Sequence, residues 1–289
     1  MFVEYPQTSE ISFEMREVLH PLFAALPDGI SEYTFANIYL FRDTHKYRIA
    51  KVGGEAQFVI TGEDKGQKFF MLPFGLPEKD VLASLFNKAG YLKCVSMRQS
   101  MALSLLGYYI NEDRDNFDYF YLRGQLADLD GRDLHKFRNR INKFTREYRC
   151  DARFLLDEFV GDAIAVLEKW KQERGDVGDY TASKEALEKM NGLQLCGGIF
   201  YVDDQPVGYT LGEELALGRS FVIHFEKAIE TEKYKGLYQY ITNSFAKILP
   251  EKYETINREQ DLGDAGLRRA KESYDPTGFV KKFKAFKEL

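Results

Sequence analysis

Hydrophobic residues alternate with polar ones in several stretches of the chain and recur every three or four positions in others, which predicts a mixture of strands and helices. In the first half the expected order is helix, three strands, helix, strand, helix and strand, with Ser31 as the expected N-cap of the first helix. The segments are, in that order, 31–43, 47–52, 56–62, 68–75, 77–90, 92–97, 100–106 and 115–122.

The second half repeats this order of elements, with two additional helices near its start. The expected segments are helices 132–148, 159–175 and 182–192, strands 196–204, 206–215 and 220–228, helix 237–249, strand 253–259, helix 264–273 and strand 279–286. The repeat predicts a mixed α/β protein of two lobes, 1–125 and 126–289, each with a mixed central sheet flanked by helices. A ligand is expected in the cleft between them.

The composition is that of an ordinary globular protein, with 44% hydrophobic and 29% charged residues among 289. Its three cysteines, Cys94, Cys150 and Cys196, form no CxxC pair, and its four histidines have no metal-ligand spacing. We therefore expect free thiols in a reducing cytoplasm, and no metal site. No apolar run reaches the roughly 18 residues of a membrane helix, and no signal peptide is visible, so we expect no transmembrane segment.

Basic residues are concentrated in the helix predicted over 132–148. From Gly131 to Arg149, seven basic residues stand against two acidic ones, which gives +5 and leaves −10 for the rest of a chain of net charge −5. Such a face can bind a phosphate backbone or an anionic lipid headgroup, and its alternative is a solvated helix surface. The candidate polyanion-binding residues are Arg132, Lys136, Arg138, Arg140 and Lys143.

A second candidate is the loop that leads from the strand 220–228 into the helix 237–249. Helix N-termini present unpaired N–H groups and suit phosphate. The candidate donor-binding residues in this loop are Lys233, Lys235, Gly236 and Tyr238. Their spacing resembles the [QR]xxGx[GA] pyrophosphate loop of the GNAT acetyltransferase superfamily, with Tyr238 in place of the last small residue. The alternative is an ordinary strand–helix connection with a glycine turn.

The strand 220–228 carries the third candidate. Alternation places His224 and Glu226 on one side of the sheet, where they could act as a proton acceptor and its neighbour. The alternative is a structural histidine within a strand.

The helix near the C-terminus carries the fourth. Asp264 is the expected N-cap, and Leu267, Ala270 and Tyr274 form the expected buried sector. Lys271 lies at the edge of this sector, so its amine either extends outward to water or points into a cavity.

Several segments together resemble the phosphatidylglycerol lysyltransferase C-terminal-like family. They are SEYTFANIYLFRDTHKYRIA, FFMLPFG, LDGRDLHKFRNRINKF, HFEKA with YKGLYQYI, and NREQDLGDAGLRRAKESYDP. The resemblance implies a tandem GNAT-like fold, related to the Fem-type aminoacyltransferases, and transfer of an aminoacyl group from charged tRNA to an amine or hydroxyl acceptor. Gly266, Leu267 and Lys271 occupy the family's GLxxxK pattern. The family's Trp-Glu-Pro-Arg continuation and its transmembrane half are absent from this sequence.

The leading hypothesis is an acyltransferase that works in the second lobe or the cleft, with the first lobe as a scaffold. Lys271 and Arg258 would stabilise developing negative charge, and Glu259, His224 or Glu226 would take the acceptor's proton. The basic helix would hold tRNA or another polyanion, and peripheral membrane contact stays open. One alternative is an N-acyltransferase that uses acetyl-coenzyme A. The other is a polyanion-binding module without catalysis.

Overall fold

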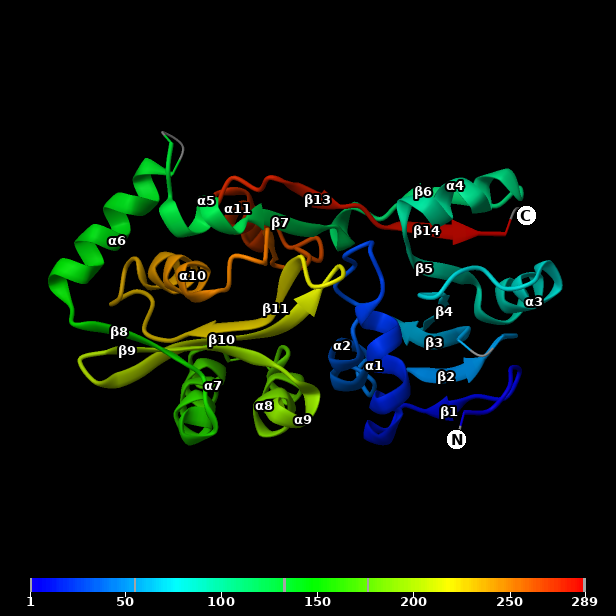
Figure 1. Cartoon of the computed structure of the whole chain (residues 1–289), viewed down its shortest axis with the longest axis horizontal. Coiled ribbons are helices and arrows are strands. Elements are labelled where there is room, and N and C mark those ends of the chain that lie inside the picture. Colours follow the sequence, from blue (N-terminus) through cyan, green and yellow to red (C-terminus); the bar gives the residue numbers. More distant parts are fainter. Residues whose placement is uncertain (1, 55, 132–133, 176, 288–289) are drawn as a thin grey trace.

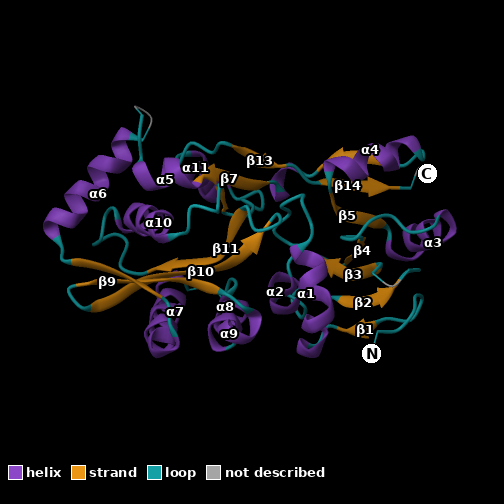
Figure 2. Cartoon of the chain, in the orientation of Figure 1, coloured by secondary structure: helices purple, strands orange, loops and turns teal. Residues whose placement is uncertain are grey.

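The computed structural model describes residues 2–54, 56–131, 134–175 and 177–287. Its strands form two seven-stranded sheets that lie side by side along the longest axis of the molecule (Figure 1). Helices flank both sheets (Figure 2). The predicted fold class, a mixed α/β protein of two lobes with helices around each sheet, is confirmed.

The first sheet has the strand order β1-β2-β3-β4-β5-β14-β6. Its strands are β1 (Ser9–Glu10), β2 (Arg48–Lys51), β3 (Phe58–Asp64), β4 (Gln67–Met71), β5 (Tyr91–Val95), β6 (Tyr109–Glu112) and β14 (Phe283–Phe286). The helices of this lobe are α1 (Arg16–Ala24), α2 (Phe35–Leu40), α3 (Lys79–Ala89) and α4 (Met97–Leu105).

The second sheet has the order β13-β7-β12-β11-β10-β9-β8. Its strands are β7 (Asp118–Leu122), β8 (Cys150–Phe154), β9 (Cys196–Val202), β10 (Gln205–Leu215), β11 (Ser220–Ala228), β12 (Thr255–Asn257) and β13 (Gly278–Val280). Its helices are α5 (Arg123–Asp128), α6 (His135–Glu147), α7 (Val160–Arg174), α8 (Tyr180–Glu188), α9 (Met190–Leu193), α10 (Leu237–Ile248) and α11 (Ala265–Glu272).

The two sheets exchange strands across the middle of the chain. β7 comes from the first half but pairs with β12 and β13 in the second sheet, and β14 returns from the C-terminus to pair with β5 and β6 in the first. The single last strand expected over 279–286 is wrong, because β13 and β14 belong to different sheets. Alternation identifies a strand but not its partner, so the lobe boundary near residue 125 stays a prediction.

Ser31 is not the N-cap of α2. The side chain of Thr34 accepts the hydrogen bond from the Asn37 amide instead, at 3.1 Å. Ser31 lies in a buried polar cluster, where its amide and hydroxyl donate to the carboxylate of Asp118 at 2.9 and 2.8 Å. The sequence correctly indicates a side-chain cap before this apolar helix, but Thr34 provides the cap, three residues after Ser31.

At the centre of that cluster, Lys282 joins the two lobes. Its side chain is 0% exposed and its ammonium donates to Asp118, at 2.6 Å, and to Glu32. Glu32 precedes α2 in the first lobe, Asp118 begins β7 in the second sheet, and Lys282 lies in the crossing between β13 and β14. Burial would lower the pKa of Lys282, but the two carboxylates outweigh burial and hold it above its usual value.

Replacing Lys282 should destabilise the fold strongly. In Lys282→Met the carboxylates of Asp118 and Glu32 lose their counter-charge while they stay buried, and such a loss costs about 3–5 kcal/mol. Chemical denaturation would measure the free energy of unfolding.

The neighbouring Lys281 is the matched control, because its pair with Glu112 is exposed, with side chains 44% and 53% accessible. Lys281→Met should cost less than about 1 kcal/mol. Equal losses for the two variants would contradict the role of Lys282 as the link between the lobes.

Candidate active site

The parallel strands β11 and β12 separate soon after they pair. β12 pairs along its length with Ser220–Val222, whereas β11 continues to Ala228. From Ile223 onward, β11 therefore has no β12 partner, and the sheet opens between the two strands. Because side chains from both strand ends project into such an opening, this is where a site formed by the second lobe is expected.

Arg258 and Glu226 form an ion pair at this opening. The Arg258 Nη2 atom donates to Glu226 Oε1 at 2.6 Å, and the two side chains are only 13% and 11% exposed. The guanidinium also lies 4.6 Å from the centre of the Tyr274 ring. Arg258 Nη1 and Glu226 Oε2 are buried without a hydrogen-bond partner among the described residues. Each of the two side chains therefore has one hydrogen-bonding atom that forms no hydrogen bond to the described part of the protein.

Lys271 points inward from α11. Its ammonium donates to the backbone oxygen of Arg258 and, at 3.3 Å, to that of Glu259. Burial of the amine is the main cause, and the charge of Arg258 the second, of a pKa of Lys271 that is lowered to about 8. Of the two alternatives for this lysine, extension into water is wrong.

The expected buried sector of α11 is largely wrong. Leu267 is 40% exposed and Ala270 is exposed, whereas Tyr274, just beyond the helix, is buried. The helix wheel assumed that the apolar face packs on a core, but this short helix lies at the surface. Its amino end is built as expected, because the side chain of Asp264 accepts from the Leu267 amide at 2.6 Å.

Asp261 holds the loop between β12 and α11 in place. This carboxylate is 0% exposed and accepts hydrogen bonds from Tyr119 at 2.7 Å, Arg268 at 2.8 and 2.9 Å and Arg114 at 3.1 Å. Burial would raise its pKa, but the bonds from Arg268 and Tyr119 outweigh burial and lower it. The loop sets the direction of Lys271. Sequence reasoning missed this cluster because its partners come from distant parts of the chain.

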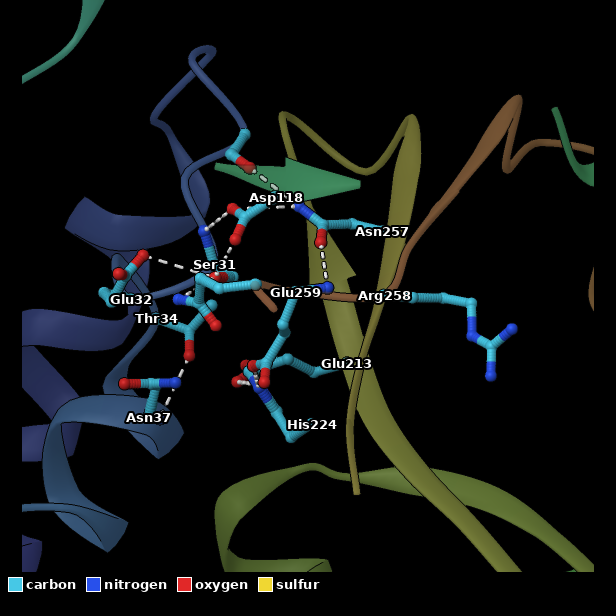
Figure 3. A network of polar contacts seen from close by, with 12 residues as sticks. Ser31, Glu32, Thr34, Asn37, Asp118, Glu213, His224, Asn257, Arg258 and Glu259 are labelled. Atoms are coloured by element: carbon cyan, nitrogen blue, oxygen red, sulfur yellow. Dashed lines mark hydrogen bonds and ion pairs between the residues drawn. The ribbon is translucent and has the colours of Figure 1, made fainter. Parts of the chain in front are cut away.

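His224 forms a second cluster, with Glu259 and Glu213. Its Nδ1 lies 2.7 Å from Glu259 Oε1 and its Nε2 lies 3.0 Å from Glu213 Oε1, so a carboxylate faces each ring nitrogen (Figure 3). Burial would lower the pKa of His224, but the bonds to Glu213 and Glu259 raise it to about 10. At neutral pH the ring is therefore an imidazolium with no lone pair to accept a proton. This arrangement favours the structural alternative for His224.

His224 and Glu226 have different partners, although alternation predicted that they share one side of the sheet. The register between β10 and β11 shifts here, since Leu211 faces Phe225 and Gly212 faces Ile223. His224 is the extra residue of this bulge. In Figure 3 the Arg258 side chain points away from the His224–Glu259 pair. The five candidate catalytic residues are thus brought near one strand end, but in two groups.

The candidate phosphate loop is covered by α6. Gly236 has φ 113°, and a Cβ on it would lie 3.0 Å from the backbone oxygen of Arg140. Lys233 is already bound to Glu230 and to the Tyr234 hydroxyl, each at 2.9 Å. Lys235 is exposed, and Tyr238 is partly buried. The assignment of this loop to a pyrophosphate stays a prediction, and the packing of α6 weighs against it.

The basic helix α6 lies at the end of the molecule far from the first lobe (Figure 1). Lys136, Arg140 and Lys143 are exposed along one side, and Lys143 is 3.7 Å from Glu147. Arg138 instead donates to the backbone oxygens of Leu129 and Gly131, which steadies the start of the helix. Arg132 lies outside the described residues.

Within the described part of the chain, no group of three or more His, Cys, Asp or Glu side chains could hold a metal ion. The three cysteines are free thiols. None of the helices in that part is long and apolar enough to cross a membrane.

Residues 23–286 match the sequence profile of the family described as phosphatidylglycerol lysyltransferase, C-terminal. The chain belongs to this family. Among curated proteins, an uncharacterised protein of Mycoplasmoides gallisepticum is 27% identical over 182 residues, 60% of this chain and 56% of that protein. The match thus spans just over half of that relative.

Solved structures resemble this member of the phosphatidylglycerol lysyltransferase C-terminal family over nearly its whole length. A conserved protein of unknown function from Bacteroides thetaiotaomicron has 27% identity and a TM-score of 0.86, over 97% of this chain and 99% of that one. The L-PGS of Bacillus licheniformis has 12% identity and a TM-score of 0.67, over 98% and 93%. FemX, with 9% identity and a TM-score of 0.58 over 98% and 97%, shares the fold.

A tandem GNAT protein of clavulanic acid biosynthesis, with 8% identity and a TM-score of 0.50 over 96% and 97%, has the same two-lobed arrangement. The expected tandem GNAT-like fold is therefore confirmed. Membership of the phosphatidylglycerol lysyltransferase C-terminal family, together with this fold, supports a transferase of the acyltransferase type.

The ionisation of His224 can be tested directly. Because two carboxylates hold its proton, the ring should remain an imidazolium at pH 8, where an ordinary histidine is neutral. Nitrogen-15 chemical shifts of the imidazole rings would report this, with His224→Gln identifying the signal. His20 is an internal control, since burial and the charge of Arg16 lower its pKa. A neutral His224 at pH 8 would contradict this description of the cluster.

Proposed function

We propose that the protein transfers an aminoacyl group from aminoacyl-tRNA to an amine or hydroxyl acceptor, at the opening between β11 and β12. The observation that carries the proposal is the buried Arg258–Glu226 pair, in which one guanidinium nitrogen and one carboxylate oxygen have no partner. An ester carbonyl needs a donor for its oxygen, and an attacking amine or hydroxyl needs an acceptor for its proton. The pair supplies both within one buried site.

In this reaction the acceptor's nitrogen or oxygen attacks the ester carbonyl carbon and forms a new bond to it. The bond between that carbon and the ribose oxygen of the tRNA then breaks. Arg258 stabilises the negative charge that develops on the carbonyl oxygen, and the Lys271 ammonium adds positive charge beside it. Glu226 takes the acceptor's proton, which is returned to the leaving ribose oxygen. Glu259, bound to His224, orients the strand end rather than accepting the proton.

Two features favour tRNA over coenzyme A as the carrier of the acyl group. The exposed cations Lys136, Arg140 and Lys143 on α6 suit a phosphate backbone. The loop that would hold the pyrophosphate of coenzyme A is packed against α6 at Gly236.

The test is to incubate the purified protein with total tRNA that has been charged with radiolabelled amino acids. Acceptors are supplied in separate reactions as small amines, peptides and vesicles that contain phosphatidylglycerol. Label should leave the tRNA and appear in one class of acceptor. Tight RNA binding without transfer would favour the polyanion-binding module. Thermal stabilisation by acetyl-coenzyme A, without any by charged tRNA, would favour the N-acyltransferase.

Lys271→Ala should abolish this transfer while the fold persists. Removing the amine leaves two backbone oxygens without a donor, at a cost of about 1–3 kcal/mol, so the Tm should fall by only a few degrees. Arg269→Ala is the matched control, because Arg269 is exposed on the same helix. Full transfer by Lys271→Ala would remove this lysine from the mechanism.

The transfer rate should also depend on the charge of Lys271. Because its pKa is about 8, the stabilising ammonium is present at pH 7 and is lost as the pH rises above about 8. The ratio of wild-type to Lys271→Arg rates should therefore fall at alkaline pH, since arginine keeps its charge. A ratio that is constant from pH 7 to 10 would contradict the need for a charged lysine.

A triple variant in which glutamine replaces Lys136, Arg140 and Lys143 should bind every tRNA more weakly, whatever the sequence of the tRNA. Log affinity falls with log salt, and each lost phosphate contact makes this negative slope shallower by about 0.7–0.9. The slope should therefore become shallower by about 2–3 for the triple variant. The control replaces Lys65, Lys68 and Lys79, three exposed lysines of the first lobe. Equal slopes for the two triple variants would place the RNA elsewhere.

A further inference from the structure

A cavity of about 380 Å³ lies between the two lobes. One wall comes from α1 and the start of α2 in the first lobe, and the other from the ends of β9 and β10 in the second sheet. Its volume is in the range of small-molecule sites. The rings of Phe23, Tyr33, Phe35 and Tyr253 line it, so it offers a largely apolar body.

The polar part of the cavity wall consists mainly of hydrogen-bond acceptors. Glu213 is only 4% exposed and binds His224 through one carboxylate oxygen, while its other oxygen has no partner among the described residues. Glu214 binds Lys252 and Tyr253 through one oxygen only. His20 has no hydrogen-bond partner in the described part of the chain, and burial and the charge of Arg16 lower its pKa, so its ring is neutral.

The carboxylate group at this wall carries a net negative charge, and the positive charges nearest to it are Lys252, which is paired with Glu214, and Arg16, one turn before His20 on α1. Glu213, His224 and Glu259 together carry −1, because one imidazolium lies between two carboxylates. The Glu259 end of this group lies close to Lys271, which donates to its backbone oxygen. The Glu213 end faces the cavity, where Lys252 is already paired with Glu214. A buried negative group of this kind is stabilised when a positive charge binds beside it.

We propose that the cavity between the lobes binds an organic amine as its ammonium ion, with the nitrogen at Glu213 and Glu214 and an apolar or aromatic body between the tyrosine and phenylalanine rings. The ammonium donates to the two free carboxylate oxygens, and His20 accepts a further hydrogen bond. Aromatic rings add attraction to the cation through their faces. This inference does not depend on the transfer reaction, since binding can be measured without any acyl donor.

The site is also connected to the proposed transfer centre. Glu213 shares His224 with Glu259, and the backbone oxygen of Glu259 accepts from Lys271. A cation bound at Glu213 competes with the imidazolium for the same carboxylate. The cavity is therefore linked to the strand end that carries Arg258 through the hydrogen bonds of His224.

The two surface thiols provide a measurement of binding. Cys196 lines the cavity, whereas Cys150 lies on β8 and does not. Burial raises the pKa of each thiol to about 11, so each rate is compared with its own rate in the absence of tyramine. Modification by methyl methanethiosulfonate, followed by mass spectrometry, reports the two rates in the same sample. Tyramine should slow the reaction of Cys196 and leave that of Cys150 unchanged.

The charge requirement is tested with tyrosol, in which a hydroxyl replaces the amine of tyramine. Because the ammonium forms charge-assisted bonds, tyramine should bind at least about tenfold more tightly in a calorimetric titration. Glu214→Gln should remove most of that difference, and Glu251→Gln, at an exposed glutamate outside the cavity, should preserve it. Equal binding of tyramine and tyrosol, or no protection of Cys196 at millimolar tyramine, would overturn the proposal.

Glu213→Gln is a second variant, with the Tm and the modification rate of Cys150, which lies outside the cavity, as controls for folding. If the protein folds, tyramine binding should fall at least about tenfold. Undiminished binding in both glutamine variants would place the ammonium elsewhere and refute the assignment.

Discussion

The fold depends on a lysine that is completely buried between two lobes. Lys282 pairs with both Asp118 and Glu32; Lys282 lies in the crossing between the sheets, Asp118 in β7 of the second sheet, and Glu32 in the first lobe. A charge taken out of water is stable only beside its counter-charge. This requirement brings β14 back to the first sheet while β7 stays in the second, so neither sheet is complete without the other half of the chain.

A similar principle organises the candidate active site. Asp261 collects hydrogen bonds from Arg114, Arg268 and Tyr119, and this holds the loop after β12 in one position. The loop in turn directs Lys271 toward the backbone of the strand end. Because β11 and β12 have already separated, the Arg258–Glu226 pair remains buried with atoms unpaired. A rigid loop beside an open sheet is a suitable frame for a polar reaction in a site from which water is excluded.

The end of β12 serves two different clusters. Arg258 lies with Glu226 on the side of the opening, whereas Glu259 lies with His224 and Glu213, next to the cavity between the lobes. Arg258 and Glu259 directly follow β12, and their side chains point in different directions, so the chain after a single strand contacts both places (Figure 3). The proposed amine site and the proposed transfer centre therefore share one strand end.

The sequence by itself determined the class of fold, most helices and strands of both halves, and the basic helix α6. These features depend on local periodicity and charge, which are readable along the chain. It also named Glu226 through its place on one face of a strand, Arg258 through its place near a strand end, and Lys271 through a family pattern. It could not reveal that Lys282 is buried, that His224 is a bulged residue between two carboxylates, or that α6 covers Gly236. Only the tertiary structure decided these points, because the pairing of strands and the partners of a buried charge depend on residues far apart in the sequence.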